Sequence, residues 1–278
     1  MHPRTGVRSR LGLQILFDFN DILDGVEFAR EHGFGVLELN LGNIDFSRQL
    51  ASKRQRERIR AAAKKARVKL AAHAIEGPSL FIPSQRAVRA AVADLKQTMD
   101  QAKEAGISRV VMHLGWEMYY VLNGRPKFLH DAYPEWYERS VTESLDELKR
   151  YARGRTRLCI ENVGGFRFGF AQRILDRMLG GNLGLCLDVG HVNILSPARR
   201  RKELAFFRRH KRQIFHSHLH DNHGREDEHL AFGKGNIDFV TMFRLLAETP
   251  ALLVFEVRPK EAAVECLEYF DRLIGPKL

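Results

Sequence analysis

Five of the chain's twelve histidines lie within one short segment, residues 214–239, together with several carboxylates. The segment reads IFHSHLHDNHGREDEHLAFGKGNIDF, and its acidic residues include Asp221, Glu226, Asp227 and Glu228. Imidazole nitrogens and carboxylate oxygens are donors that bind zinc, manganese and iron in proteins. Carboxylates buried together repel one another unless cations lie among them. The segment therefore indicates metal chemistry rather than a purely structural role.

The elements that must position these residues are eight short apolar or β-branched runs, which alternate with longer helical patterns. The runs cover residues 11–17, 35–40, 68–74, 108–115, 157–163, 183–191, 214–221 and 251–257. No Ser/Gly-rich linker divides the chain. Eight strand-and-helix units predict an α/β fold, a single-domain (β/α)8 TIM barrel over residues 1–278, rather than an open doubly wound sheet. The first run also fits an arm of a buried hairpin.

The helical patterns between the runs carry recognisable ends. The segment 21–33 is typical of an amphipathic helix that follows Asp21 and ends at Gly33. The segment 84–106 in the same way follows Ser84 and ends at Gly106.

In such a barrel, catalytic groups lie where strands end and the following loops begin. Six polar residues fall at or near the ends of the last six expected strands, and three more follow in the next loops. These are His73, His113, Glu161, Asp188, His218 and Glu256, followed by His191, Asp227 and His229. Nine ligands are too many for one ion and suit two or three ions with a shared carboxylate. The share of histidine favours Zn²⁺, with Mn²⁺ or Fe²⁺ as alternatives.

The cysteines are expected to take no part in this site. Cys159, Cys186 and Cys266 are an odd, scattered set without CxxC spacing, which predicts a reducing cytosol and no disulfide framework. Cys159 and Cys186 each precede a predicted ligand by two residues, so we expect them on the same strand face but deeper in the barrel. No apolar run reaches the roughly 18 residues of a membrane span, and the N-terminus lacks an export signal. We predict a soluble, cytoplasmic protein without a membrane partner.

Four motifs in the second half of the chain resemble those of a known family: IENVGG, GLCLDVGHVN, HLHDNHGREDEHLAFGKGNID and VFEV. They are similar to the last four strands of the xylose isomerase-like TIM-barrel superfamily, the sugar phosphate isomerase/epimerase-like proteins. Their metal positions are most similar to the endonuclease IV branch, AP endonuclease family 2. The resemblance covers about residues 68 to 260. It implies a zinc-cluster phosphoester hydrolase whose nucleophile is a metal-bridged hydroxide.

The resemblance also implies how the ligands are shared among three zinc ions. The first ion would be bound by His73, His113 and Glu161, the second by Glu161, Asp188, His218 and Glu256, and the third by His191, Asp227 and His229. Glu161 would position the hydroxide, and Glu256 could accept its proton. His218 is selected because HLHD matches the family's His-x-x-Asp step, which leaves His216 deeper in the barrel and His220 at the rim.

The chain also resembles the sugar isomerases and epimerases of the same superfamily. Those enzymes hold one divalent ion with residues that match Glu161, Asp188, His218 and Glu256, and the two glutamates form a proton-transfer pair. An inward Glu38 in VLELN favours this alternative. So do the loops NVGGFRFG and HAIEGPSLFIPS, which lack the small-residue and Tyr-containing loops expected in the repair enzymes.

The extra ligands favour the hydrolase, which is the main expectation. His73, His113 and the Asp227-x-His229 element are needed by a trinuclear hydrolase, whereas a mononuclear isomerase has little use for them.

The net charge of +11 predicts an anionic substrate, either DNA or a small sugar phosphate. Arginines 199–201 begin an expected helix, where cations oppose the helix dipole and a phosphate would offset the cost. Aromatic residues of the segment 115–140 could stack on a sugar or base, or form a lid or a dimer contact; the oligomeric state is left open. Residues expected to contact substrate are Glu38, Arg167, His220, His223 and Arg258.

Overall fold

The fold is a closed barrel of eight parallel strands, seen in a computed structural model that describes residues 3–116 and 118–278. The barrel strands are β1 (Leu11–Ile15), β2 (Val36–Asn40), β3 (Lys69–His73), β4 (Ile107–Met112), β7 (Arg157–Glu161), β8 (Leu183–Asp188), β9 (Ile214–Leu219) and β10 (Leu252–Phe255). They follow one another around the barrel in chain order, and β1 closes it against β10. The predicted (β/α)8 TIM barrel is confirmed.

The first strand is a full member of the barrel and not the arm of a hairpin. β1 pairs in parallel with β2 on one side, where Gln14 lies opposite Glu38, and with β10 on the other, where Leu13 lies opposite Phe255. All five residues of β1 are buried. A strand covered on both faces reads as a continuous apolar run, which explains why its periodicity was ambiguous.

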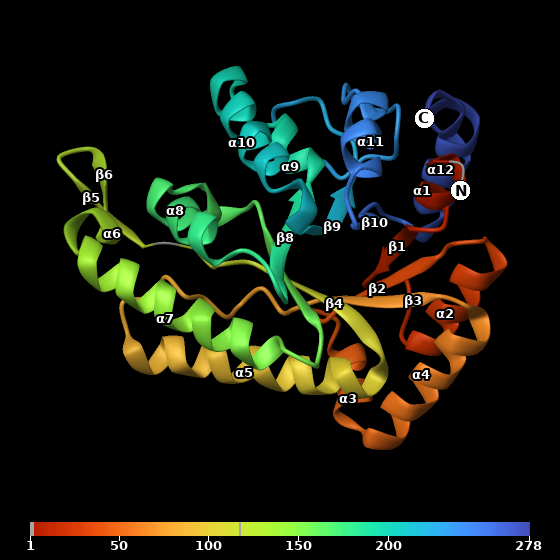
Figure 1. The fold of residues 1–278 in the computed structure, drawn as a ribbon, viewed down its shortest axis with the longest axis horizontal. Helices are drawn as coiled ribbons and strands as arrows, with labels where there is room; N and C mark the ends of the chain where they lie inside the picture. Colours follow the sequence, from red (N-terminus) through yellow and green to blue (C-terminus); the bar gives the residue numbers. More distant parts are fainter. Residues whose placement is uncertain (1–2, 117) are drawn as a thin grey trace.

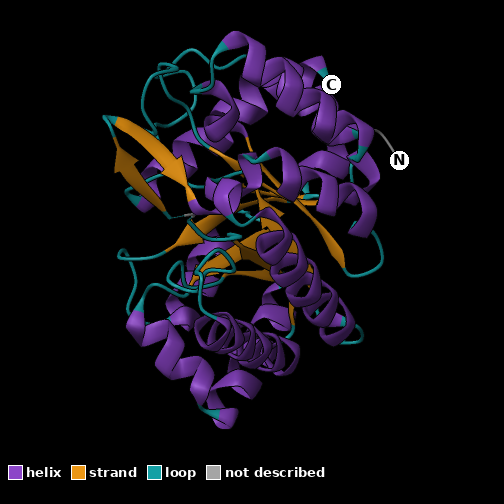
Figure 2. Ribbon diagram, turned by 90° about the vertical axis from the view of Figure 1, so that its left-hand side faces the viewer, coloured by secondary structure: helices purple, strands orange, loops and turns teal. Residues whose placement is uncertain are grey.

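Helices surround the barrel on the outside (Figures 1 and 2). Their bounds are α1 (Pro3–Arg8), α2 (Ile22–Glu31), α3 (Ile44–Ala51), α4 (Lys53–Ala66), α5 (Gln85–Ala105), α6 (Leu129–Ala132), α7 (Pro134–Ala152), α8 (Gly169–Met178), α9 (Val189–Asn193), α10 (Pro197–Arg209), α11 (Phe239–Ala247) and α12 (Lys260–Tyr269). Across the described ranges, no helix combines the length and apolar character that crossing a membrane requires.

The helix ends follow the local chemistry of the sequence. The side chain of Asp21 accepts a hydrogen bond from the backbone N–H of Leu23 at 2.9 Å, and α2 ends at Glu31, two residues before Gly33. Ser84 caps α5 through the backbone N–H of Ala87 at 3.4 Å. Gly106 ends α5 with a φ of 78°, a left-handed conformation that glycine adopts without a steric penalty.

Period-two alternation divides each strand between two environments, and β2 shows the pattern. Leu37 and Leu39 belong to the large apolar core between barrel and helices. Val36 belongs to a small apolar cluster inside the barrel, and the next residue on its face, Glu38, contacts histidines of β9. The barrel interior is thus apolar at the bottom and becomes polar toward the C-terminal ends of the strands.

The aromatic segment after β4 is not an open loop. It contains an antiparallel hairpin, β5 (Tyr119–Leu122) and β6 (Arg125–Phe128), that projects from the barrel beside α8 (Figures 1 and 2). Asn123 and Gly124 have φ values of 52° and 73°, as a two-residue type I′ turn requires. The side chains of β5 are exposed, so this strand lacks the alternation of apolar and polar residues by which a buried face can be recognised in a sequence.

The cap of α5 gives a direct test of this fold. Ser84→Ala should lower the free energy of unfolding by about 1 kcal/mol, because the first turn of α5 loses a side-chain acceptor for a backbone N–H. Ser84→Asn retains an N-cap oxygen and should keep most of that stability. Urea denaturation of the two variants would measure the difference. Equal stability of Ser84→Ala and the parent protein would show that the side chain does not cap the helix.

Candidate metal centre

The structure brings all nine predicted metal ligands together at the C-terminal mouth of the barrel, and Glu161 at the end of β7 is their centre. Oε2 of Glu161 lies 3.2 Å from Nε2 of both His73 and His113, and its Oε1 lies 3.3 Å from Nδ1 of His191. Burial alone would raise the pKa of Glu161, but His218 and the other imidazoles outweigh it, so the pKa lies well below the usual value. A carboxylate with imidazoles at both oxygens has the geometry of a bridging ligand.

An inner group of donors surrounds His218 of β9. Its Nδ1 lies 3.1 Å from Oε2 of Glu256, 3.5 Å from Oε2 of Glu161 and 3.8 Å from Oδ2 of Asp188. The ligand atoms of Asp188, His218 and Glu256 all lie within 4.8 Å of one another. One imidazole nitrogen and three carboxylates could therefore hold a single divalent ion.

An outer group lies in the loops after β8 and β9. Oδ2 of Asp227 lies 3.0 Å from Nε2 of His191 and 3.2 Å from Nε2 of His229. Burial would lower the pKa of His191, but Asp188 and the other carboxylates outweigh it and raise the pKa to about 10. The carboxylates around His191 thus favour a positive charge in this group, from a protonated imidazole or from an ion.

Unpaired nitrogens show that the imidazoles fit a metal. Four histidines each have a buried Nδ1 that makes no hydrogen bond to any described group: His113, His191, His218 and His220. Nδ1 of His191 and of His218 nevertheless approaches a carboxylate oxygen, at 3.3 and 3.1 Å. Buried polar atoms without hydrogen bonds are rare in folded proteins. Nitrogen close to carboxylate oxygen without hydrogen-bond geometry is the arrangement expected when both are to bind a shared cation.

Backbone carbonyls fix the orientation of two further ligands. Nδ1 of His73 lies 2.8 Å from the carbonyl oxygen of Ala74, and Nδ1 of His229 lies 2.9 Å from that of Glu256. Since a carbonyl oxygen only accepts, the proton belongs on Nδ1 and the lone pair on Nε2. Nε2 is the nitrogen that faces Glu161 in one case and Asp227 in the other.

His220 lies deeper than the sequence predicted. It was expected at the rim as a substrate contact, but the structure buries it fully, with Nε2 3.2 Å from both carboxylate oxygens of Asp188. Its ring stacks on that of His229 with centroids 4.0 Å apart. A Cβ at Gly190 would lie 1.9 Å from the His220 ring, so glycine is required there for this ring position. His220 therefore belongs with the candidate ligands as a tenth member.

Glu38 also lies elsewhere than expected. Instead of facing a substrate it is fully buried behind the inner group, with Oε1 3.0 Å from Nε2 of His218 and Oε2 2.7 Å from Nε2 of His216. Nε2 of Gln14 donates to Glu38 at 2.8 Å and to Glu256 at 3.0 Å. Sequence reasoning overlooked Gln14, although a polar residue near the end of an apolar strand was a usable signal. Glu38 orients His218 so that Nδ1 faces the inner group.

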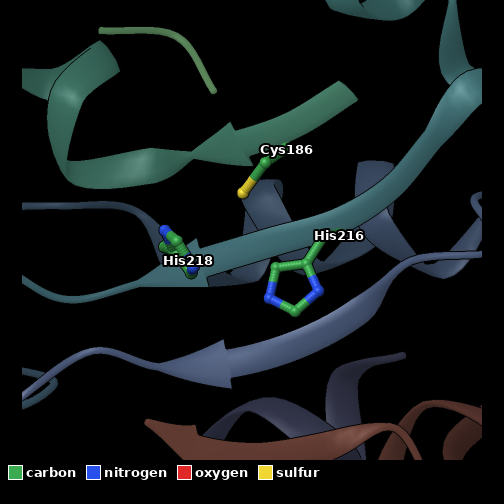
Figure 3. Close-up of side chains that lie close together, drawn as sticks. All are labelled: Cys186, His216 and His218. Atoms are coloured by element: carbon green, nitrogen blue, oxygen red, sulfur yellow. The ribbon is translucent and has the colours of Figure 1, made fainter. Parts of the chain in front are cut away.

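The two cysteines of the barrel interior lie among buried apolar residues, as expected. Cys159 and Cys186 share a small cluster that includes Val111. Figure 3 shows Cys186 on β8 beside His216 and His218 of β9, and the ligand atoms of these three residues lie within 4.8 Å of one another. Burial raises the pKa of the Cys186 thiol well above its ordinary value, which favours the protonated thiol.

The two arginines predicted to contact substrate lie beside the centre rather than inside it. Nη2 of Arg167 donates to the backbone carbonyl of His191 at 3.1 Å. Arg258, three residues after the end of β10, donates to Oε1 of Gln14. Arg167 therefore supports the segment that carries His191, whereas Arg258 contacts Gln14, the residue that donates to Glu38 and Glu256.

His223 lies away from the other predicted residues. Its side chain is 58% exposed, and Nδ1 lies 3.0 Å from Oε2 of Glu228 in the same loop. The position leaves the ring accessible to solvent at the outer edge of the site.

The fold and this set of residues define a class of protein. A family model described as "Xylose isomerase-like TIM barrel" matches residues 26–273, and the chain belongs to that family. Among its relatives, the uncharacterized proteins MJ1311 and MJ1614 of Methanocaldococcus jannaschii are each 31% identical, over 57% and 44% of this chain. The matched regions span 61% and 47% of those proteins.

Solved structures share the fold at lower identity. A D-tagatose 3-epimerase-like protein is 21% identical with a TM-score of 0.74, with 94% of this chain and 95% of that one covered. The 3-keto-D-glucoside 4-epimerase YcjR of E. coli is 17% identical with a TM-score of 0.72, covering 94% and 98%. The TTHB071 protein of Thermus thermophilus, in a structure from soaking with ZnCl2, is 23% identical with a TM-score of 0.65, covering 93% and 96%.

The outer group predicts a separable metal ion. His229→Ala should lower the metal content of protein purified without chelator by about one ion per chain, because the group loses one of its donors. Elemental analysis would measure the change, and His223→Ala, in the same loop but exposed, is the matched control. Unchanged metal content in His229→Ala would exclude an ion in the outer group.

The contact between Glu38 and His218 predicts a second effect. Glu38→Gln should weaken metal binding at the inner group by about 10- to 100-fold, because His218 loses the carboxylate that orients its ring. Competition with a chelator would measure the affinity, and circular dichroism would report whether the fold is retained. Glu57→Gln, an exposed change on α4 with the same loss of charge, should bind metal normally. Wild-type affinity in Glu38→Gln would refute the orienting role.

Proposed function

We propose that the chain is a metal-dependent isomerase or epimerase that acts on a keto sugar. The proposal is carried by the convergence of two glutamates on one imidazole: Glu256 and Glu161 place oxygens 3.1 and 3.5 Å from Nδ1 of His218. With Asp188 at 3.8 Å, these donors suit one divalent ion, Zn²⁺ or else Mn²⁺ or Fe²⁺. The fold that the chain shares with proteins named as sugar epimerases supports the proposal.

The two glutamates form the proton-transfer pair of this proposal. A bound ion would polarise the ketone and the neighbouring hydroxyl, which makes the adjacent C–H bond more acidic. Glu161, with its pKa well below the usual value, is ionised and accepts the proton from that carbon. A protonated Glu256 would give its proton to the opposite face of that carbon and invert it, or to the neighbouring carbon, with a proton moving between the two oxygens, and isomerise the sugar. Glu161 would then release its proton to solvent. Glu256, 14% exposed, can then exchange its proton with solvent.

Hydrolysis of a phosphoester by a cluster of ions is the second candidate function. The observation that favours it is the outer group, His191, Asp227 and His229, which a one-ion isomerase does not need. Glu161, with imidazoles at both carboxylate oxygens, would serve there as a bridging ligand. In that reaction these residues would hold the ions, which would activate water for attack on phosphorus.

Hydrogen exchange from solvent tests the first candidate without knowledge of the natural product. In D₂O, the metal-loaded protein should exchange the C–H next to the ketone of D-fructose or D-tagatose for deuterium, which NMR detects. Glu256→Gln should slow this exchange by about 100-fold or more, because one member of the proton-transfer pair is lost. Glu226→Gln, in the exposed loop after β9, is the matched control. Exchange that is unaffected in Glu256→Gln would exclude the proposed pair.

His113 separates the two candidate functions. His113→Ala removes a contact to Glu161 outside the inner group, so an isomerase should keep most of its rate. A hydrolase that depends on a cluster should lose activity by orders of magnitude. Parallel assays with ketoses, with bis(p-nitrophenyl) phosphate and with abasic-site DNA would measure both. Phosphoester cleavage that disappears in His113→Ala, without any ketose exchange, would replace the first candidate by the second.

A further inference from the structure

A second polar feature lies directly beside the metal centre. A cavity of about 550 Å³ opens between the end of the β5–β6 hairpin, the turn that precedes α8, and the first half of α10. Its volume is within the range of small-molecule sites. The proposed function does not use this cavity, because none of the candidate ligands lines it.

Cations dominate the charged lining of the cavity. Arg167, Arg199 and Lys202 line it together with a single carboxylate, that of Glu203. Glu203 is buried and accepts a hydrogen bond from Nδ2 of Asn162 at 2.8 Å. Burial raises the pKa of Glu203 above its ordinary value. The cavity therefore offers a net positive environment to a ligand.

The start of α10 carries uncompensated positive charge. Its first turn contains no acidic residue, and Arg199 lies there although cations oppose the helix dipole at this end. Across the cavity, Nε of Arg167 is buried and makes no hydrogen bond to any described residue. An anion in the cavity would offset the cost of the positive charge at the start of α10.

Aromatic side chains form the opposite wall. Trp116, Phe128 and Phe168 line the cavity, and the rings of Phe128 and Phe168 lie 5.4 Å apart. Trp116 packs over Gly164, where an added Cβ would lie 3.4 Å from the indole ring. Flat apolar surface opposite cations is suited to a ligand with a carbon skeleton at one end and an anionic group at the other.

Hydrogen bonds connect the cavity wall to the metal centre. Asn162 follows Glu161 directly, accepts from the backbone N–H of Asp188 at 2.7 Å and donates to Glu203. Arg167 donates to the carbonyl of His191. The residues that line the cavity are thus joined by hydrogen bonds to the segments that carry Glu161, Asp188 and His191.

We propose that the substrate is a phosphorylated sugar whose phosphate binds in this cavity, contacted by Arg167, Arg199 and Lys202. The sugar lies along the aromatic wall, and its reacting end extends to the inner group of metal ligands. The proposal rests on the proposed function, because it names the class of sugar on which that site acts.

Binding to the full-length chain tests the proposal apart from turnover. Calorimetry on metal-free protein should show binding of fructose 6-phosphate at least 10-fold tighter than that of fructose, with inorganic phosphate as a competitor. Arg199→Gln and Lys202→Gln should each weaken fructose 6-phosphate binding about 10-fold or more and leave fructose unchanged. Arg201→Gln, with the same charge change on the same exposed helix, is the control and should bind normally.

Three outcomes would overturn the proposal: equal affinity for the two sugars, unchanged binding in both cavity variants, or an equal loss in Arg201→Gln. The last would show a diffuse effect of charge rather than a site. The binding result does not depend on whether the protein is an isomerase, because the metal-free protein performs no turnover. If the cavity binds the phosphate but no C–H exchange occurs, only the isomerase proposal is rejected. If fructose and fructose 6-phosphate exchange at equal rates in the parent protein and in both cavity variants, only the phosphate site is rejected.

Discussion

The burial of carboxylates at one end of the barrel is the constraint on which the rest of the site depends. Glu38, Glu161 and Asp188 are each at most 2% exposed, and imidazoles rather than ammonium or guanidinium groups are their main neighbours. Buried charge is costly unless it is compensated. Imidazole differs from the other cations because it can release its proton and give the nitrogen lone pair to a metal. The contacts that stabilise the metal-free fold are therefore the ones that an ion would replace.

The barrel and the membership of the centre were predictable because both depend on position along a strand. Parallel strands covered on both faces leave apolar runs, and a polar residue at the end of such a run must lie at the mouth. His73, Glu161 and Asp188 were found in this way. The β5–β6 hairpin was missed for the opposite reason: its residues are exposed, so no buried face imposes a period on them.

Depth inside the barrel was the part that the sequence could not supply. His216, His218 and His220 share one face of β9, and period two alone does not tell which level each reaches. Pairing between β8 and β9 decides it, with Asp188 opposite His218 and a register shift after Leu185. Pairing between β2 and β3 places Glu38 opposite Ala71, two residues before His73, and so behind the candidate ligands rather than beside a substrate.

Gln14 ties the metal centre to the closure of the barrel. Gln14 lies on β1, which pairs with β2 on one side and with β10 on the other. Its side-chain amide donates to Glu38 on β2 and to Glu256, which follows β10. An ion bound by Glu256 and His218 would hold the same residues together from the mouth. With an ion bound there, loss of metal and release of β1 from its neighbours would be linked equilibria, each favouring the other. Solvent exchange of the amide protons of the first strand would accordingly report the occupancy of a site to which that strand contributes no ligand.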